Sequence, residues 1–351
     1  MTTDILFERR GAAGLVTLNR PRALNALTHA MVRALAAQLA DWARDDAVSR
    51  VIVTAEGERA FCAGGDIRAL YDLGRAGRQD EQLAFFREEY TLNTAIKRFP
   101  KPYIALIDGL VMGGGVGISI HGSHRVAGER YAFAMPEVGI GFFPDVGATY
   151  ALPQMAGEIG TFCAVTGERL STADAVAAGA ATHHVRSARF PDLREALCGT
   201  VPPDAVIAAF AEPREAGPVM QRRAVIDRLF APARIEDILA ALDAEAASGS
   251  ADAGWAAGIA TTMRTKSPTS LKIAREQMRR GRTLSFEDCM QTEFRIVSRI
   301  VYGSEFYEGI RAVIIDKDNK PDWRPAALAE IGETEIARYF APLEGEELDL
   351  T

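Results

Sequence analysis

Cysteine is scarce in this 351-residue sequence, which contains four of them. Cys62, Cys163, Cys198 and Cys289 lie far apart, and no two form a C-x-x-C pair. This spacing excludes the disulfide framework of small secreted proteins and the paired cysteines of many zinc sites. It favours reduced thiols in a cytosol-like compartment. Cys62 lies in a glycine-rich turn, where a nucleophilic role must be considered, but no histidine lies near it in sequence, which favours a small packing residue.

A hydrophobic run long enough to span a bilayer is also missing. The first residues, MTTDILFERRGAAG, contain neither an apolar signal-peptide core nor an amphipathic stretch rich in Arg and Ser. From these two absences we expect a cytoplasmic protein with no membrane partner.

The sequence has no excess of basic residues. Lys and Arg number 40 against 47 Asp and Glu, which gives a formal net charge of -7. Nucleic-acid-binding proteins carry basic surfaces, so we expect no nucleic-acid partner. Local Lys and Arg side chains could still hold an anionic small molecule.

Histidine is rare too, with five residues. His121 and His124 stand three apart, but no carboxylate or cysteine completes a ligand set with them, so we expect no metal. The sequence has no Gly-x-Ser-x-Gly elbow of a serine hydrolase. The glycines at 113–117 lack the Lys-Ser/Thr ending of a phosphate-binding P-loop.

Strand and helix patterns alternate in the first half. Residues 15–18, 51–53 and 103–107 are short apolar runs typical of strands. Between the first two, Thr28 is a candidate N-cap for a helix whose apolar residues recur at helical spacing: Met31, Val32, Leu35, Leu39 and Trp42. Strands separated by crossover helices predict an α/β fold with a largely parallel sheet.

The second half has a different pattern. Ala-rich and charged helical stretches follow residue 188, separated by prolines and glycines. We predict a core at residues 1–187 and a helical region at 188–351 that packs on it. Leu271, Ile273, Ala274 and Met278 mark one predicted buried helix face, and Phe294, Ile296, Val297 and Ile300 mark another.

Two glycine-rich turns and two acids supply the candidate chemistry. The turns are Ala63–Asp66 and Met112–Gly115, and they precede Glu137 and Asp145. Glycines let backbone amides approach a ligand closely. Two such turns could direct two amide hydrogens at one oxygen, the arrangement that an oxyanion hole for acyl transfer requires.

The sequence around these residues resembles the crotonase (enoyl-CoA hydratase/isomerase) superfamily, and within it the 3-hydroxyisobutyryl-CoA hydrolases. The resemblance covers nearly the whole chain and rests on AFCAGGDI (60–67), MGGGVGISIHG (112–122), FAMPEVGIGFFPDVG (133–147), FFREEYTLN (85–93), KSPTSLKIA (266–274) and YEGIRAVIIDKD (307–318). It implies a crotonase-like ββα spiral core that carries a thioester site, followed by the C-terminal helical region.

The resemblance also implies roles for individual residues. The amides of Gly65 and Gly114 match the two oxyanion-hole donors, and Glu137 and Asp145 match the catalytic acids of the hydrolases. Glu89 matches a substrate-contacting glutamate. The hydratases use two catalytic glutamates; the position that matches the first is Gly117 here, and the second is retained as Glu137. The resemblance therefore implies that the protein is a hydrolase and that it is a poor hydratase, because adding water to a double bond needs both carboxylates.

The implied reaction is hydrolysis of a short branched 3-hydroxyacyl-CoA, most simply 3-hydroxyisobutyryl-CoA of valine breakdown. CoA arrives as part of the substrate, and no metal or redox cofactor is implied. Crotonase-like cores often trimerise, although the helical extension could cover the same face within one chain. The sequence leaves open whether Glu137 acts as nucleophile or as general base.

Other interpretations of these residues stay open at this stage. Asp145 could be a helix N-cap, Glu137 a surface ion-pair partner, and Glu89 part of a solvated helix face. Two other functions are also compatible with the motifs: an enoyl-CoA hydratase or isomerase, and a non-catalytic protein that binds acyl-CoA.

Overall fold

The computed structural model describes residues 3–350. By its contacts the chain divides into two compact units, each assembled from three segments. The first unit comprises Met1–Asp66, Glu88–Ala134 and Arg169–Gln221, and the second comprises Ile67–Arg87, Met135–Glu168 and Arg222–Thr351. The predicted boundary at residues 187 and 188 falls inside the first unit, and a division at that point stays a prediction.

The first unit contains two sheets. The larger has six strands in the order β1-β2-β3-β5-β7-β10, and all its neighbours are parallel except β1 and β2. These strands are β1 (Ile5–Arg10), β2 (Ala13–Leu18), β3 (Arg50–Ala55), β5 (Tyr103–Ile107), β7 (His124–Ala127) and β10 (His183–His184). The prediction of an α/β fold with a largely parallel sheet is confirmed.

The predicted helix between β2 and β3 is α1 (His29–Arg44). The hydroxyl of Thr28 accepts a hydrogen bond from the amide of Met31 at 3.2 Å, so the predicted N-cap is confirmed. The five apolar residues that predicted this helix are the five it buries.

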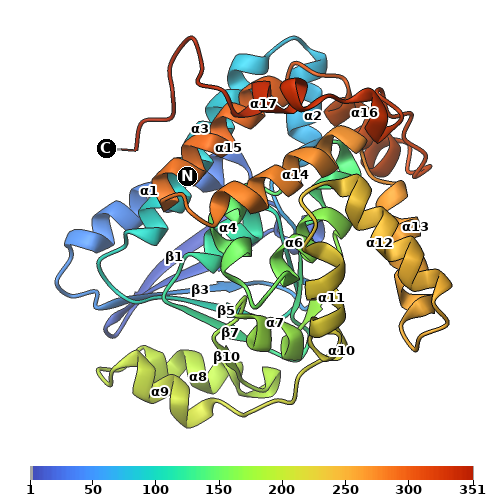
Figure 1. Ribbon diagram of the computed structural model, residues 1–351. Helices are drawn as coiled ribbons and strands as arrows, with labels where there is room; N and C mark the ends of the chain where they lie inside the picture. The colour runs from blue at the N-terminus through green and yellow to red at the C-terminus, as the bar shows by residue number, and fades with distance from the viewer. Residues whose placement is uncertain (1–2, 351) are drawn as a thin grey trace. The chain divides into compact units, whose positions relative to one another are not determined.

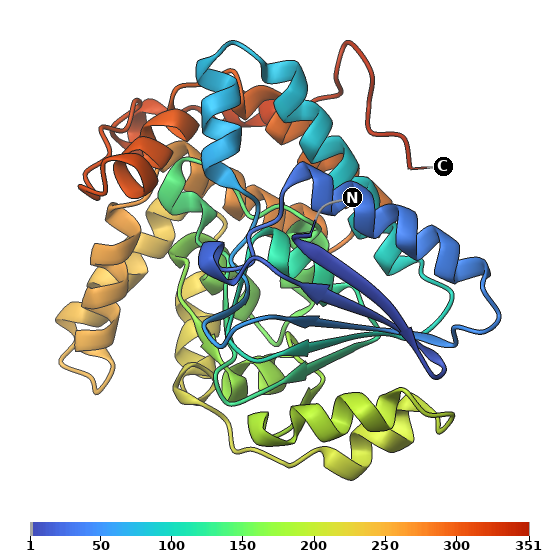
Figure 2. The same ribbon diagram turned by 180° about the vertical axis from the view of Figure 1, so that it is seen from behind.

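Two helices, α8 (Phe190–Leu197) and α9 (Pro203–Phe210), cover one face of the larger sheet. Figures 1 and 2 show this pair lying along the strands. Leu193, Leu197 and Ile207 from the helices join Ile52 and Ile104 from the strands in one buried cluster. Each fully buried side chain of this size stabilises the fold by about 1.5–3 kcal/mol.

The smaller sheet positions the glycine turns. Its strands are β4 (Ala60–Cys62), β6 (Leu110–Met112), β8 (Ala132–Ala134) and β9 (Leu170–Ser171), in that order. Strands β4 and β6 are parallel, so their carboxyl ends meet at one edge of the sheet. The turn with Gly65 follows β4, and the helix α4 (Gly114–Ile120) follows β6.

The first unit is completed by short helices and by the second part of α3 (Gln79–Lys97). The short helices are η1 (Pro21–Ala23), α7 (Thr172–Ala178), η4 (Ser187–Arg189) and α10 (Pro218–Gln221).

The second unit is helical throughout its described regular elements. Besides the first part of α3 it contains α2 (Ile67–Arg75), η2 (Glu137–Ile140), α5 (Ala148–Ala151), η3 (Leu152–Gln154), α6 (Ile159–Thr166), α11 (Arg223–Phe230), α12 (Ile235–Ala247), α13 (Ala253–Arg264), α14 (Pro268–Gly281), α15 (Phe286–Ile300), α16 (Glu305–Ile310), η5 (Arg311–Ile315), η6 (Leu328–Glu330) and α17 (Glu333–Phe340). The apolar faces predicted for residues 271–278 and 294–300 are buried in α14 and α15.

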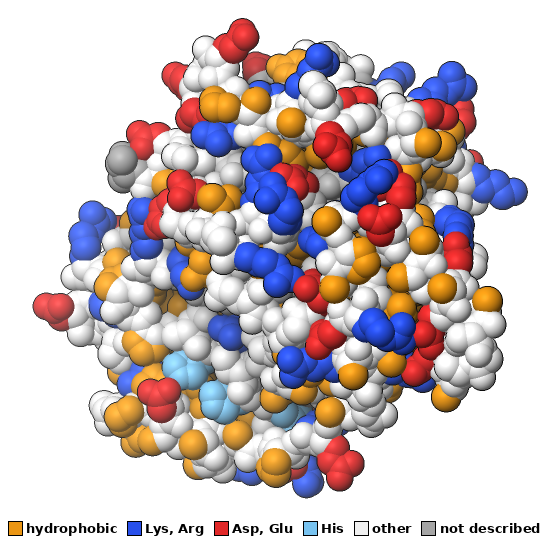
Figure 3. Space-filling view, in the orientation of Figure 1, with side chains coloured by type: hydrophobic (Ala, Val, Ile, Leu, Met, Phe, Trp, Pro, Cys, Tyr) orange, Lys and Arg blue, Asp and Glu red, His pale blue; other side chains and the backbone are white. Residues whose placement is uncertain are grey.

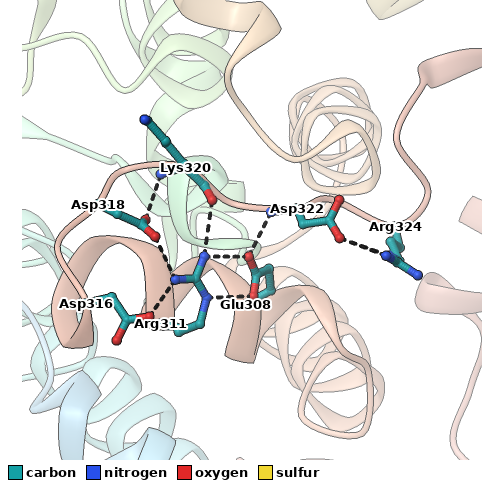
Figure 4. Close-up of polar contacts among 7 residues, drawn as sticks. All are labelled: Glu308, Arg311, Asp316, Asp318, Lys320, Asp322 and Arg324. Carbon is teal, nitrogen blue, oxygen red and sulfur yellow. Dashed lines mark hydrogen bonds and ion pairs between the residues drawn. The ribbon is translucent and has the colours of Figure 1, made fainter.

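Arg311 organises the segment that follows α16. Its guanidinium donates to both carboxylate oxygens of Glu308, at 2.9 and 2.8 Å, and to Asp316 and Asp318, at 2.6 and 2.8 Å. It also donates to the carbonyl of Lys320 at 3.1 Å, as Figure 4 shows. The N–H donors of Arg311 are therefore used in hydrogen bonds that hold this segment together, which gives Arg311 a structural role within the run 307–318.

No helix among residues 3–350 is long and apolar enough to cross a membrane.

Candidate active site

The first unit brings three of the predicted site residues together. A β-carbon built on Gly114 would stand 2.5 Å from Oε1 of Glu89 and 3.3 Å from the amide nitrogen of Gly65. Glu89 lies on α3 and is 2% exposed. A side chain at position 114 would therefore displace the Glu89 carboxyl group from this position.

Both candidate amides are set by local backbone structure. A parallel bridge between Leu27 and Gly65 uses the carbonyl of Gly64 and the amide of Asp66, at 2.8 Å each, and does not use the amide of Gly65. Gly114 begins α4, and the first amides of a helix have no partner within the helix. The two turns thus present backbone donors at one edge of the smaller sheet.

Cys62 lies beside these turns and is fully buried. Burial raises the pKa of its thiol to about 12, and its Sγ lies 3.5 Å from the carbonyl of Gly64. Because the thiolate is the nucleophilic form, a thiol with this pKa is inert near neutral pH. The interpretation of Cys62 as a packing residue is supported.

The second unit holds the two candidate acids. Glu137 follows Pro136 and begins the short helix η2, which closes at Gly141 in a left-handed conformation. The side chain is 7% exposed, and its Oε2 has no hydrogen-bond partner among the residues that the structure describes. Burial raises the pKa of Glu137 well above its ordinary value, and the nearby carboxylates of Asp145 and Glu293 raise it further.

Asp145 is 4% exposed and lies on the loop between η2 and α5. The next two residues have left-handed backbones, with φ of 55° at Val146 and 86° at Gly147. A β-branched residue rarely adopts this conformation, so the surrounding structure must hold Val146 in place. The aromatic rings of Phe142 and Phe143 precede the loop, and Phe142 packs against Phe306 at 5.2 Å between centroids.

Glu293, on α15, is a buried acid that the sequence reasoning missed. It is 0% exposed, and its carboxylate accepts the amides of Gly147 at 2.7 Å and Thr149 at 2.8 Å. Burial raises the pKa of Glu293 to about 8, with a further contribution from the charge of Asp145, although the two amide bonds favour the anion. The raised pKa therefore favours the protonated form of Glu293 near neutral pH.

Gln277, on α14, is a second missed residue. It is 0% exposed, and its Nε2 donates to the carbonyl of Pro144 and to the hydroxyl of Thr149, at 2.8 Å each. A signal for both residues exists in the sequence. Glu293 and Gln277 lie at helical spacing within the apolar faces of α15 and α14, where a polar residue is unexpected.

The structure decides the alternatives for the three predicted side chains. Asp145 is not an N-cap, because α5 begins at Ala148 and its N-cap is Gly147. Glu137 is too buried to be a surface ion-pair partner, and Glu89 is too buried to belong to a solvated face. Burying three carboxyl groups is costly and points to a chemical use.

A metal site, or a surface of one charge sign, requires particular side chains to gather among the described residues. Among residues 3–350, no group of three or more His, Cys, Asp or Glu side chains is arranged to hold a metal ion. On the face shown in Figure 3, the described basic and acidic side chains are interspersed.

Comparison with known proteins identifies close relatives. The chain is 43% identical to the mitochondrial 3-hydroxyisobutyryl-CoA hydrolase of Danio rerio, over 99% of this chain and 92% of that protein. It is 39% identical to the Homo sapiens enzyme of the same name, over 98% and 90% of the two chains.

Two solved structures are similar over nearly their full length. A carnitinyl-CoA dehydratase from Mycobacterium thermoresistibile has a TM-score of 0.93 at 41% identity and covers 99% of both chains. An enoyl-CoA hydratase from Rhodobacter sphaeroides has a TM-score of 0.91 at 39% identity, over 99% of this chain and 100% of the other. The predicted crotonase-like fold is therefore confirmed.

These relatives overturn the expected location. The curated relatives from Danio rerio, Gallus gallus and Homo sapiens are all named as mitochondrial proteins, so the prediction of a cytoplasmic protein is wrong. Reduced cysteines and the lack of a membrane-spanning run do not distinguish the cytosol from another reducing compartment, which is why these features misled the prediction.

The family itself follows from the sequence match. Residues 13–340 match the family model described as enoyl-CoA hydratase/isomerase. By this match and by its relatives, the chain belongs to the enoyl-CoA hydratase/isomerase, or crotonase, family.

Proposed function

We propose that this protein is an acyl-CoA thioester hydrolase that converts 3-hydroxyisobutyryl-CoA and water into 3-hydroxyisobutyrate and CoA. Curated relatives at about 40% identity over nearly the whole chain carry this name. The structural observation that carries the proposal is the pair of buried, electrostatically coupled carboxyl groups of Glu137 and Asp145. In this role the protein would act in valine breakdown.

The backbone amides of Gly65 and Gly114 are proposed to form the oxyanion hole. The thioester oxygen gains negative charge in the tetrahedral state, and fixed donors stabilise that charge by about 3–4 kcal/mol each. Their support in the structure is the close approach of the two glycines at the edge of the smaller sheet.

Glu137 is proposed as the nucleophile. Its carboxylate oxygen forms a bond to the acyl carbon, the carbon–sulfur bond breaks, and the CoA thiolate leaves and takes up a proton. Water then hydrolyses the mixed anhydride, releases the hydroxy acid and regenerates the carboxylate. The Oε2 atom of Glu137, which has no partner among the described residues, is available for this attack once its proton has left.

Asp145 is proposed to orient the hydrolytic water. In the alternative mechanism Glu137 acts as general base on that water, and no anhydride forms. Acid quenching during turnover, followed by mass spectrometry, separates the two. A protein carrying the acyl group on the peptide with Glu137 supports the nucleophile, and an unmodified protein under rapid turnover supports the base.

Glu89 is proposed to accept a hydrogen bond from the 3-hydroxyl of the acyl group. Glu89 is buried beside Gly114, one of the two proposed oxyanion-hole residues. This position supports the role, because it places the carboxyl group next to the proposed thioester site. CoA enters as part of the substrate, and the proposed reaction needs no resident metal or redox cofactor.

Hydration of an enoyl-CoA is the second candidate, favoured by the names of the two most extensively matching structures described above. Against it stands Gly117, at the position that matches the first of the two catalytic glutamates of hydratases. Gly117 is buried within α4 and offers no carboxylate.

The test is thiol release from purified protein with 3-hydroxyisobutyryl-CoA, 3-hydroxypropionyl-CoA, crotonyl-CoA and acetyl-CoA, beside Glu137→Gln. Rapid release from the hydroxyacyl thioesters, lost in the variant, supports the hydrolase. Loss of crotonyl-CoA absorbance without thiol release indicates a hydratase. Binding of the thioesters without either reaction assigns the protein to the non-catalytic class.

A further inference from the structure

The loop that carries Asp145 is held by buried side chains of two helices. It runs from Pro144 to Thr149, in the first turn of α5, and α15 and α14 of the same unit both pack against α5. A β-carbon on Gly281 of α14 would stand 1.7 Å from the carbonyl oxygen of Thr149. The helix and the loop therefore meet at backbone distance, with no side chain between them.

Glu293 engages the donors of this loop. Its Oε2 accepts the amide of Gly147 and its Oε1 accepts the amide of Thr149, so one carboxylate ties two peptide units together. The amide of Gly147 directly follows Val146, and the amide of Thr149 lies two residues beyond Gly147; Val146 and Gly147 both have left-handed backbones. The bonds thus hold a backbone conformation that Val146 alone would leave.

Gln277 engages the acceptors of the same loop. Its Nε2 donates to the carbonyl of Pro144, on one side of Asp145, and to the hydroxyl of Thr149, on the other. Together the two helices contact both ends of the loop. The carboxylate of Glu293 accepts from backbone amides, and the side-chain amide of Gln277 donates to oxygens. A fully buried arrangement of this kind is rigid, because leaving any of these groups unpaired would be costly.

We propose that Glu293 and Gln277 are positioning residues that fix the Asp145 loop for hydrolysis. This inference rests on the proposed function of Asp145. It gives the C-terminal helices α14 and α15 a part in the reaction, although neither residue need contact the substrate.

Glu293 also has an electrostatic effect that Gln277 lacks. Its carboxyl group lies near those of Glu137 and Asp145, and on its own helix the titratable neighbour is the thiol of Cys289. Where Glu293 is ionised, its charge opposes ionisation of Glu137, so removing that charge should ease ionisation of Glu137. Replacement of Gln277 changes no charge and should leave that ionisation where it is.

The experiment compares Glu293→Gln and Gln277→Leu in the full chain with two matched controls. Glu276→Gln makes the same chemical change at a carboxylate that pairs with Arg279 and Arg280. Gln291→Leu removes an amide that makes one bond of 3.3 Å, to the carbonyl of Leu348. For each protein, kcat and KM are measured from pH 5 to 9, with the unfolding temperature and the hydrogen exchange of amides 145–149.

We expect both test variants to lose roughly 10- to 100-fold in kcat with little change in KM, because a small misplacement of a reacting group has this cost. Only Glu293→Gln should shift the acidic limb of the kcat/KM profile to lower pH. Both should exchange the loop amides faster than the two controls do.

Activity equal to that of the controls, in variants that fold, overturns the proposal, as does slow exchange of the loop amides in both variants. If the wild-type protein releases no thiol, the proposed function fails. Hydrogen exchange then still decides whether the two residues hold the loop.

Discussion

The carboxyl group of Glu89 occupies the space that a side chain on Gly114 would need, since a β-carbon there would stand 2.5 Å from its Oε1. Both residues are buried, and the amide nitrogen of Gly65 lies 3.3 Å from the same point. The position of the Glu89 carboxyl group and the positions of the Gly65 and Gly114 amides therefore depend on one another.

Gly114→Ala should reduce kcat/KM by about 100-fold or more, because the methyl group would displace either Glu89 or the amide of residue 114 from its working position. Thiol release from 3-hydroxyisobutyryl-CoA measures this. Gly258→Ala in α13 is the matched control, since a β-carbon there meets nothing within 4 Å. If the two variants hydrolyse the thioester equally well, the close approach at Gly114 has no catalytic importance.

Glu89→Gln should weaken selection for the 3-hydroxyl group. Loss of a hydrogen bond to a charged acceptor costs about 1.5–3 kcal/mol, so the preference for 3-hydroxyisobutyryl-CoA over isobutyryl-CoA should fall by roughly 10- to 100-fold in kcat/KM. The neighbouring Glu88 pairs with Arg33 and His29, and Glu88→Gln should leave the preference unchanged. An unaltered preference in Glu89→Gln would remove this residue from hydroxyl recognition.

The activity should rise with pH through an unusually high pKa for a glutamate. Glu137 must be ionised to attack or to act as base, and burial together with Asp145 raises its pKa well above the ordinary value. Asp145→Asn removes one of the charges that raise it, so the acidic limb of kcat/KM should move to lower pH while kcat falls. Asp243→Asn, at a surface pair with Arg264, is the control; a limb that stays in place in Asp145→Asn contradicts the coupling.

The stability of the protein should fall as pH rises from about 4.5 to about 8 because of Glu293. The pKa of this buried acid is raised from 4.5 to about 8, so between these values the folded state holds a proton that the unfolded state has released. Glu293→Gln should reduce the loss of stability across this range. Urea unfolding at pH 5.5 and pH 8 measures the effect, and an equal loss in wild type and variant would show that Glu293 is ionised throughout.

Cys62 should be dispensable for the chemistry. With a pKa of about 12 its thiol stays protonated and buried, so Cys62→Ala should retain kcat within about threefold and lose only packing stability. Thiol release and the unfolding temperature are the two measurements. Complete inactivation of a folded Cys62→Ala protein would reopen the nucleophile interpretation.

Local sequence pattern was sufficient to predict several regular elements of the first unit. The Thr28 cap and five apolar residues predicted α1, and the apolar runs 51–53 and 103–107 lie within β3 and β5. These signals are local, because side-chain periodicity and capping act within one or two turns of chain.

The two missed residues show where local pattern fails. Glu293 and Gln277 lie on apolar helix faces, but no local pattern indicates their partners. Those partners, Gly147, Pro144 and Thr149, lie 128 to 146 residues away along the chain. No spacing rule connects residues so distant. Burial of a polar side chain becomes visible only when its helix is packed.

The sequence by itself determined the family, the strand and helix pattern, and the identity of the glycines and acids proposed for catalysis. Motif spelling and periodicity are properties of neighbouring residues. Tertiary structure alone decided that Glu89 and Glu137 are buried, that Glu293 joins the acids, and that the Asp145 loop is tied to α14 and α15. The physical reason is that desolvation and charge coupling depend on what surrounds a group in space, which packing of distant segments creates.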